Sequence, residues 1–413
     1  MLNQDIVREA TRLTRTGQLM EATALLQRML RGDSTPAATP DRSTRTAPAR
    51  LAPPTIEGES TRVEERERRP AQAASKPAGD MRAKSAEAKP AQAAFGSRKR
   101  PVRREDFSEL PGFGLRSPLQ RAPAMRDIAP EGTQFVEGHF SNAAGRRAYK
   151  LFIPSQAQGR RLPLIVMLHG CTQSPDDFAA GTRMNFAGEE QACFVVYPEQ
   201  PNAANQSKCW NWFRTGDQQR DGGEPALIAG ITRKIMREQP IDPNRVYVAG
   251  LSAGGAAAAI MAATYPDLYA AVGIHSGLPH GAARDLPSAM MAMRQGSAAG
   301  GVANGGAAIP VIVFHGDRDQ TVHPNNGERV VAQATAVRPG ETSVVRGRVP
   351  GGHAYTQTIL TDAKGQATSE HWSIHGAGHA WSGGSPAGSY TDPKGPDASK
   401  EMLRFFLAHP RGG

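Results

Sequence analysis

The run from Arg245 to Thr264 constrains the fold more than any other part of this chain. Residues 245–249 read Arg-Val-Tyr-Val-Ala and predict a short buried strand, and residues 255–264 are alanine-rich and predict a helix. Gly250-Leu-Ser-Ala-Gly254 lies between them. A strand, a tight turn and a helix in this order raise the Ser252 hydroxyl above the end of a sheet, as in a nucleophile elbow. The alternative is an ordinary glycine-rich turn that caps a helix.

A serine nucleophile needs a histidine base and an acid that orients it, here expected in the order serine, acid, histidine. Residues 309–316 predict a buried strand that ends in a turn, and Asp317 and Asp319 follow it. We favour Asp319 as the acid because its carboxylate must clear the end of the strand to reach the histidine. Asp317 is the alternative, and either side chain could instead hydrogen-bond to its own loop.

The histidine expected to act as the base is His379. It lies in a glycine-rich loop after residues 370–375, which alternate like the last strand of a sheet. His371, His375 and His379 are four residues apart, a spacing that gathers metal ligands only on a helix. The glycines and the alternation argue against a helix here, so we expect neither a metal site nor a cofactor.

A tetrahedral oxyanion needs two hydrogen-bond donors beside the nucleophile. Residues 162–168 predict a core strand that runs into His169-Gly-Cys-Thr-Gln173. A turn of this kind supplies one backbone donor, and the residue after the nucleophile supplies the other. The predicted oxyanion donors are therefore the backbone N–H groups of Cys171 and Ala253.

Several further motifs occur in order along the chain. They are His169-Gly-Cys-Thr-Gln, Cys209-Trp-Asn-Trp-Phe, Gly222-Gly-Glu-Pro-Ala-Leu-Ile, Gly250-Leu-Ser-Ala-Gly-Gly, His315-Gly-Asp-Arg-Asp and Gly378-His-Ala-Trp-Ser-Gly-Gly. Together they resemble the catalytic domain of polyhydroxybutyrate (PHB) depolymerases, a group related to feruloyl and acetylxylan esterases. The resemblance covers about residues 130–410.

The resemblance implies an α/β-hydrolase fold, with a mostly parallel central sheet and helices on both faces. It implies a Ser252–His379–Asp319 triad that hydrolyses short-chain hydroxyalkanoate esters, and a disulfide between Cys171 and Cys209. Feruloyl or acetylxylan esters are the alternative substrates. A protein without catalytic activity that binds a granule or another partner is the alternative from outside the enzymes.

Two tryptophans within these motifs are candidates for substrate contact. Trp210 follows Cys209, and Trp381 lies two residues after His379. An apolar cleft beside the triad would suit the methyl and methylene groups of a hydroxybutyrate unit. Packing in the core is the alternative for such aromatic side chains. Cys193 begins an apolar run and is expected to be a buried thiol.

The chain of 413 residues divides by composition into three predicted regions. Residues 1–31 have the periodicity of a short helical hairpin, residues 32–125 are a Pro-rich, basic segment expected to be disordered, and residues 126–413 hold the catalytic domain. Residues 1–110 contain 21 Lys and Arg against 15 Asp and Glu. This basic arm could bind an anionic or granule partner, whereas nucleic acid is not expected because no nucleic-acid-binding motif is present.

The sequence shows no secretory signal and no run long enough to span a membrane. We therefore expect a cytoplasmic location. The disulfide that the resemblance implies favours an oxidising compartment instead, and the sequence does not resolve this conflict.

Overall fold

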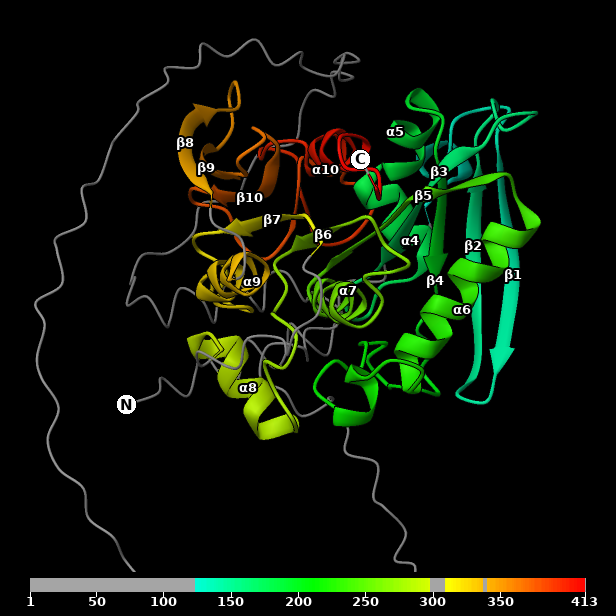
Figure 1. The fold of residues 1–413 in the computed structure, drawn as a ribbon, viewed down its shortest axis with the longest axis horizontal. Coiled ribbons are helices and arrows are strands. Elements are labelled where there is room, and N and C mark those ends of the chain that lie inside the picture. Colours follow the sequence, from blue (N-terminus) through cyan, green and yellow to red (C-terminus); the bar gives the residue numbers. More distant parts are fainter. Residues whose placement is uncertain (1–122, 298–308, 337–339, 413) are drawn as a thin grey trace, which may run out of the picture. The chain divides into compact units, whose positions relative to one another are not determined.

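In the part of the chain that the structure describes, residues 123–297, 309–336 and 340–412 of a computed structural model, ten strands form one mixed sheet. Its strand order is β1-β2-β4-β3-β5-β6-β7-β10-β9-β8. The run from β4 to β10 is parallel throughout, and antiparallel strands extend it at both ends. Figure 1 shows the sheet with helices packed on both sides. The predicted fold class, a mostly parallel sheet covered on both faces, is confirmed.

The strands vary from long edge strands to short central ones. Their bounds are β1 (Gln134–Asn142), β2 (Gly145–Ile153), β3 (Leu162–Leu168), β4 (Phe194–Pro198), β5 (Ile241–Leu251), β6 (Ala271–His275), β7 (Val311–Gly316), β8 (Glu341–Arg348), β9 (Ala354–Thr361) and β10 (Ala367–Ile374). A separate pair of two-residue strands, β11 (Trp381–Ser382) and β12 (Thr391–Asp392), lies in the loops that follow β10.

The helices connect successive strands or cover the sheet. Their bounds are α3 (Met125–Ile128), α4 (Pro175–Thr182), α5 (Met184–Glu190), α6 (Gly223–Glu238), α7 (Ala253–Thr264), α8 (Leu286–Gln295), α9 (Asn325–Thr335) and α10 (Ala398–Leu407), with a 3₁₀ turn η2 (Thr215–Gln218). Among the described helices, none has the length and apolar character needed to cross a bilayer.

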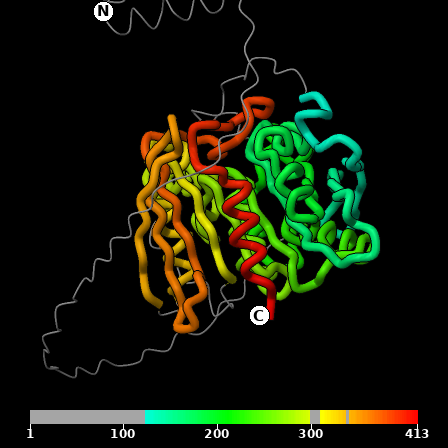
Figure 2. Tube along the Cα trace, turned by 90° about the horizontal axis from the view of Figure 1, so that it is seen from above, coloured from blue at the N-terminus to red at the C-terminus, as the bar shows by residue number. Residues whose placement is uncertain are grey.

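Successive side chains of the central strands point to opposite faces of the sheet and so contribute to two apolar layers. On β5, Val246 and Val248 belong to one buried cluster, and Tyr247 and Ala249 belong to the other. The first cluster packs beneath α6, α7, α8 and α9, and the second beneath α4, α5 and α10. Figure 2 shows α10, in red, running alongside the strands of the sheet. Because both faces are covered, these strands are apolar on both sides, as parallel strands usually are.

Most of the elements predicted around the site are present. The strand predicted at residues 162–168 has these same bounds in the structure, and α7 follows the turn at Ser252 directly. The strand predicted at 245–249 extends from 241 to 251. Cys193 is the free, buried thiol that was predicted. The predicted hairpin at 1–31 and nearly all of the segment at 32–125 lie outside the described residues.

Candidate active site

The three predicted catalytic residues lie at one edge of the sheet. Ser252 follows β5, Asp319 lies beyond the end of β7, and His379 lies beyond the end of β10. These strands belong to the parallel run, in the order β5-β6-β7-β10. The carboxyl ends of parallel strands face the same way, so the loops that hold these residues leave the sheet at the same edge, where α/β proteins place their ligands.

Ser252 occupies a strained turn between β5 and α7. Its backbone has φ 57° and ψ −119°, a conformation that is costly for a residue with a side chain. Glycine is required on either side of it, because a Cβ on Gly250 would overlap the backbone of Gly254, and a Cβ on Gly254 would overlap the carbonyl oxygen of Leu168. The Ser252 N–H donates to the carbonyl oxygen of His275 at 2.9 Å, which ties the turn to the end of β6. The sequence folds here as a nucleophile elbow does.

Asp319 is the acid that the structure brings to His379. The His379 Nδ1 lies 2.7 Å from the Asp319 Oδ2, and the Asp319 Oδ1 accepts the N–H groups of Thr321 and Val322, both at 2.9 Å. The carboxylate is therefore fixed by its own loop while its second oxygen orients the imidazole. With Nδ1 held in this way, Nε2 is the nitrogen left for the serine.

Asp317, the alternative acid, faces elsewhere. Its carboxylate accepts the N–H of Gly376 at 2.7 Å and lies 3.0 Å from the Nδ1 of His375. The side chains of this pair are 39% and 44% exposed, whereas that of Asp319 is fully enclosed. Asp317 therefore fastens the turn after β10 at the surface.

The surroundings keep Asp319 ionised. Burial alone would raise the pKa of its carboxyl, but the charge of His379 and the hydrogen bonds from His315 and His379 outweigh burial. The pKa of Asp319 is consequently held well below its usual range. An ionised carboxylate at Nδ1 favours the imidazolium that forms when the histidine takes a proton.

The three histidines spaced four residues apart go to different surroundings. His371 is in the middle of β10, and burial lowers its pKa to about 4. His375 contacts Asp317 and the Thr356 hydroxyl, and His379 contacts Asp319. Over the described ranges, no cluster of three His, Cys, Asp or Glu side chains is arranged to hold a metal.

The predicted oxyanion loop is fixed on both sides of Cys171. Cys171 is bonded to Cys209 through a disulfide, and the N–H of the next residue, Thr172, donates to the carbonyl oxygen of Ser207 at 2.7 Å. The Gly170 N–H donates to the Gln173 Oε1 at 2.9 Å. The Cys171 N–H itself and the Ala253 N–H at the start of α7 donate to no group in the described part of the chain. Both are thus available to an oxygen atom of a ligand.

The structure corrects the expectation for Trp210 and Trp381. Both side chains are enclosed, at 0% and 1% exposure. The Trp210 Nε1 donates to the carbonyl oxygen of His169, and the Trp381 Nε1 donates to the Ser399 hydroxyl, each at 3.1 Å. A ring with no open face and an occupied N–H supports the site from behind and offers no surface to a substrate.

Sequence reasoning missed His275, a residue that supports the site. It ends β6, between the strands that precede Ser252 and Asp319. Burial, together with the neighbouring charges of His315 and His379, lowers its pKa to about 3, so it is neutral. Its place directly after the short apolar run at residues 270–274 was the available signal.

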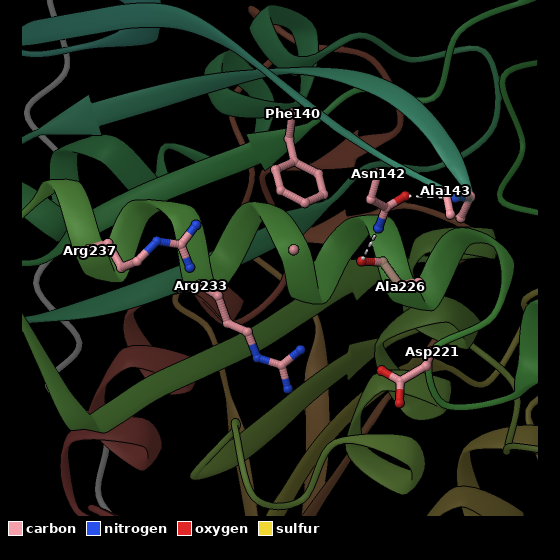
Figure 3. Close-up of a pocket in the computed structure, with 9 residues that line it drawn as sticks. Phe140, Asn142, Ala143, Asp221, Ala226, Arg233 and Arg237 are labelled. Atoms are coloured by element: carbon pink, nitrogen blue, oxygen red, sulfur yellow. Dashed lines mark hydrogen bonds between the residues drawn. The ribbon is translucent and has the colours of Figure 1, made fainter.

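A hollow of about 340 Å³ lies away from these residues, between α6 and the end of β1 (Figure 3). Phe140 and Asn142 from β1 line it together with Arg233 and Arg237 from α6. The Phe140 ring lies over Gly230, where a Cβ would overlap it. None of the predicted site residues lines this hollow, so it is separate from the candidate active site.

Comparison with known proteins identifies relatives of this chain among the esterases. Residues 147–345 match the family described as Esterase PHB depolymerase. The chain is 35% identical over 229 residues to poly(3-hydroxyalkanoate) depolymerase C of Paucimonas lemoignei, covering 52% of this chain and 54% of that protein. It is 27% identical over 246 residues to feruloyl esterase B of Neurospora crassa, covering 55% of this chain and 82% of that one. The chain thus spans about half the length of the depolymerase it matches.

A solved structure has the same fold. An acetyl xylan esterase from Aspergillus awamori superposes with a TM-score of 0.52 at 18% identity, over 66% of this chain and 99% of that one. This similarity shows the α/β-hydrolase fold. The predicted resemblance is confirmed: residues 147–345 match the PHB depolymerase family model, and the relatives are named as depolymerases and esterases.

Proposed function

We propose that this protein is a serine esterase that hydrolyses short-chain hydroxyalkanoate esters, the polymer or its oligomers, through an acyl-enzyme. One observation carries the proposal. The 2.7 Å hydrogen bond between His379 and the buried Asp319 forms at the sheet edge where Ser252 occupies a strained elbow. Nucleophile, acid and base follow β5, β7 and β10 of the parallel run, in the chain order that such hydrolases use.

The reaction follows from the roles of these groups. Ser252 attacks the ester carbonyl while the His379 Nε2 takes the hydroxyl proton, and Asp319 stabilises the imidazolium. The oxyanion accepts hydrogen bonds from the N–H groups of Cys171 and Ala253. The alcohol leaves with the proton from His379, and water then attacks the acyl-enzyme with His379 as the base.

The substrate class is supported by the match to a poly(3-hydroxyalkanoate) depolymerase at 35% identity. Feruloyl and acetylxylan esters are the second candidate class, because the chain also matches a feruloyl esterase and shares the fold of an acetyl xylan esterase. All of these substrates are carboxylic esters, so the same triad serves each of them.

The test is turnover of four substrates by the wild-type protein and by Ser252→Ala. The substrates are p-nitrophenyl butyrate, 3-hydroxybutyrate oligomers, methyl ferulate and acetylated xylan. We expect the wild-type protein to hydrolyse the first two best and the variant to be slower by several orders of magnitude with an unchanged fold. Near-normal activity of Ser252→Ala would refute the mechanism, and a preference for ferulate or acetylxylan would replace the substrate class.

A further inference from the structure

Glu224 is a buried carboxylate that the proposed reaction does not use. Glu224 lies in the first turn of α6, and only 6% of its surface is exposed. A buried acid side chain is costly unless its oxygens are well satisfied by hydrogen bonds. Its partners therefore indicate what the side chain is for.

All three donors to the Glu224 carboxylate come from the segment between β4 and α6. The Oε2 accepts the backbone N–H of Asn211 at 2.7 Å, and the Oε1 accepts the Asn211 Nδ2 at 2.7 Å and the Gln200 Nε2 at 2.5 Å. Arg147 of β2 adds a cation 3.7 Å from the Oε1. The carboxylate thus fixes two points on either side of Cys209.

Hydrogen bonds and a disulfide connect Gln200, and the segment beside Asn211, to the oxyanion loop. The Gln200 N–H donates to the His169 Nε2 at 3.1 Å, and the Gln200 Nε2 also donates to the carbonyl oxygen of Cys209 at 2.9 Å. Between the two points, the Trp210 Nε1 donates to the carbonyl oxygen of His169. The disulfide then joins Cys209 to Cys171. The links from the Gln200 N–H, Trp210 and Cys209 end at His169 or Cys171, within two residues of the free Cys171 N–H.

His169 completes the connection because it is held neutral. Burial lowers its pKa to about 4, so its Nε2 is free to accept from Gln200 while its Nδ1 lies 2.8 Å from the carbonyl oxygen of Gly170. These two contacts fix the His169 ring against the backbone of Gly170. The direction of the Gly170–Cys171 peptide, and with it the direction of the Cys171 N–H, depends on them.

We propose that Glu224 is a positioning residue that holds the Cys171 N–H in the direction needed for the oxyanion, acting through Gln200, Asn211 and the Cys209–Trp210 segment. This inference rests on the proposed esterase function. A donor fixed before the reaction stabilises charge that develops in the transition state without reorganisation. Its loss is expected to lower kcat and leave KM nearly unchanged.

The decisive variant is Glu224→Gln. It keeps the size of the side chain but replaces one oxygen with an NH₂ group, and each oxygen of Glu224 now faces a donor. A donor would therefore meet a donor, and the anchor would be broken without a cavity. Glu238→Gln is the matched control, because Glu238 is at the other end of α6 and pairs with Lys234 near the surface.

A second variant changes the pKa of Glu224 in a known direction. Burial and the neighbouring charge of Asp217 raise the pKa of Glu224 to about 7, against the hydrogen bond from Asn211, the charge of Arg147 and the hydrogen bond from Gln200. Asp217 itself accepts the Glu224 N–H at 2.8 Å and is near Arg214 and Arg147. Asp217→Asn keeps an oxygen acceptor for this N–H and removes the like charge. It should lower the pKa of Glu224 and move the acid limb of the kcat profile to lower pH.

The experiment combines steady-state kinetics on p-nitrophenyl butyrate with amide hydrogen exchange of peptides that cover residues 168–173. For Glu224→Gln we expect kcat to fall at least about tenfold with KM within about twofold of wild type, and exchange in these peptides to rise. Glu238→Gln should match the wild-type protein in both measurements. Unchanged kcat and exchange in a folded Glu224→Gln protein would overturn the inference and leave the esterase function standing.

Two further outcomes separate the inference from the proposed function. If the wild-type protein hydrolyses no ester, the proposed function fails, and unchanged exchange in Glu224→Gln then overturns the positioning role as well. If Glu224→Gln is too unstable to purify, the Asp217→Asn profile decides. An acid limb that stays in place overturns the role of Glu224, and a limb that moves to lower pH supports it.

Discussion

His275 at the end of β6 stacks on Trp381, the residue two positions after His379, with ring centroids 5.1 Å apart and an interplanar angle of 26°. The His275 Nε2 also accepts the N–H of Ser382 at 3.0 Å, and its carbonyl oxygen accepts the N–H of Ser252. One buried residue therefore joins the nucleophile turn, through its backbone, to the loop that holds the base, through its neutral imidazole.

Replacing His275 should therefore impair catalysis although it belongs to no triad. His275→Phe keeps a ring for stacking but leaves the buried Ser382 N–H without an acceptor, a loss of about 1–3 kcal/mol. We expect a decrease of this size in the free energy of unfolding and a fall of about tenfold in kcat. Urea denaturation and steady-state kinetics measure the two effects. The exposed His139 gives the control His139→Phe, and equal kinetics in the two variants would contradict the linking role.

The two acids after β7 provide a matched pair of substitutions. Asp319→Asn leaves the shape of the loop but removes the charge at the His379 Nδ1, and it should lower kcat by about 10⁴. Asp317→Asn removes a half-exposed partner of His375 and should change kcat less than about threefold. Initial rates on p-nitrophenyl butyrate distinguish the two variants. A larger loss of kcat in Asp317→Asn than in Asp319→Asn would show that Asp317, and not Asp319, is the acid.

The disulfide between Cys171 and Cys209 should contribute both stability and activity. It closes a loop with a sequence separation of 38, for which chain entropy predicts about 4 kcal/mol. Cys171→Ser and Cys209→Ser should therefore lower the unfolding free energy by up to this amount, and kcat should fall because the oxyanion loop loses an anchor. Cys193→Ala removes the free thiol and is the control for loss of a cysteine. Wild-type kcat in both serine variants would show that hydrogen bonds alone hold the loop.

Acid should destabilise the protein steeply because three buried histidines are neutral. Burial lowers the pKa of His169 and His371 to about 4 and that of His275 to about 3. On unfolding they regain an ordinary pKa near 6.5 and take up protons, so their contribution to stability is present above that pH and is lost as pH falls toward 4.

Glu224 acts in the opposite direction. Its pKa of about 7 in the folded state lies above the ordinary value, so the folded protein holds this proton more tightly between pH 4.5 and 7. Near pH 5 the lowered pKa values of the three histidines outweigh the raised pKa of Glu224, so these four groups together take up protons on unfolding and the free energy of unfolding should fall as the pH falls. Urea midpoints between pH 4.5 and 6.5 measure this dependence. A flat profile would show that the histidines are not neutral in the folded state.

Much of the site could be predicted because its parts are local. The elbow needs glycine at 250 and 254 for steric reasons that act within one turn, and the apolar runs around it are long enough to predict β3, β5 and α7. The preference for Asp319 over Asp317 also followed from a local argument, the reach of a side chain beyond a strand end. The structure brings Asp319 to His379 and leaves Asp317 at the surface.

Only the tertiary structure decided the residues that act through distant neighbours. Trp210 and Trp381 were expected to contact the substrate, but they are enclosed: Trp210 packs on His169, and Trp381 packs on Phe178 and His275, all distant in sequence. The contacts of Glu224 with Asn211 and Gln200, and of His275 with Trp381, join loops that the strand order brings together. Sequence by itself determined where strands end and which chemistry follows them, since periodicity and steric limits act over a few residues. The packing of one loop on another depends on the whole sheet.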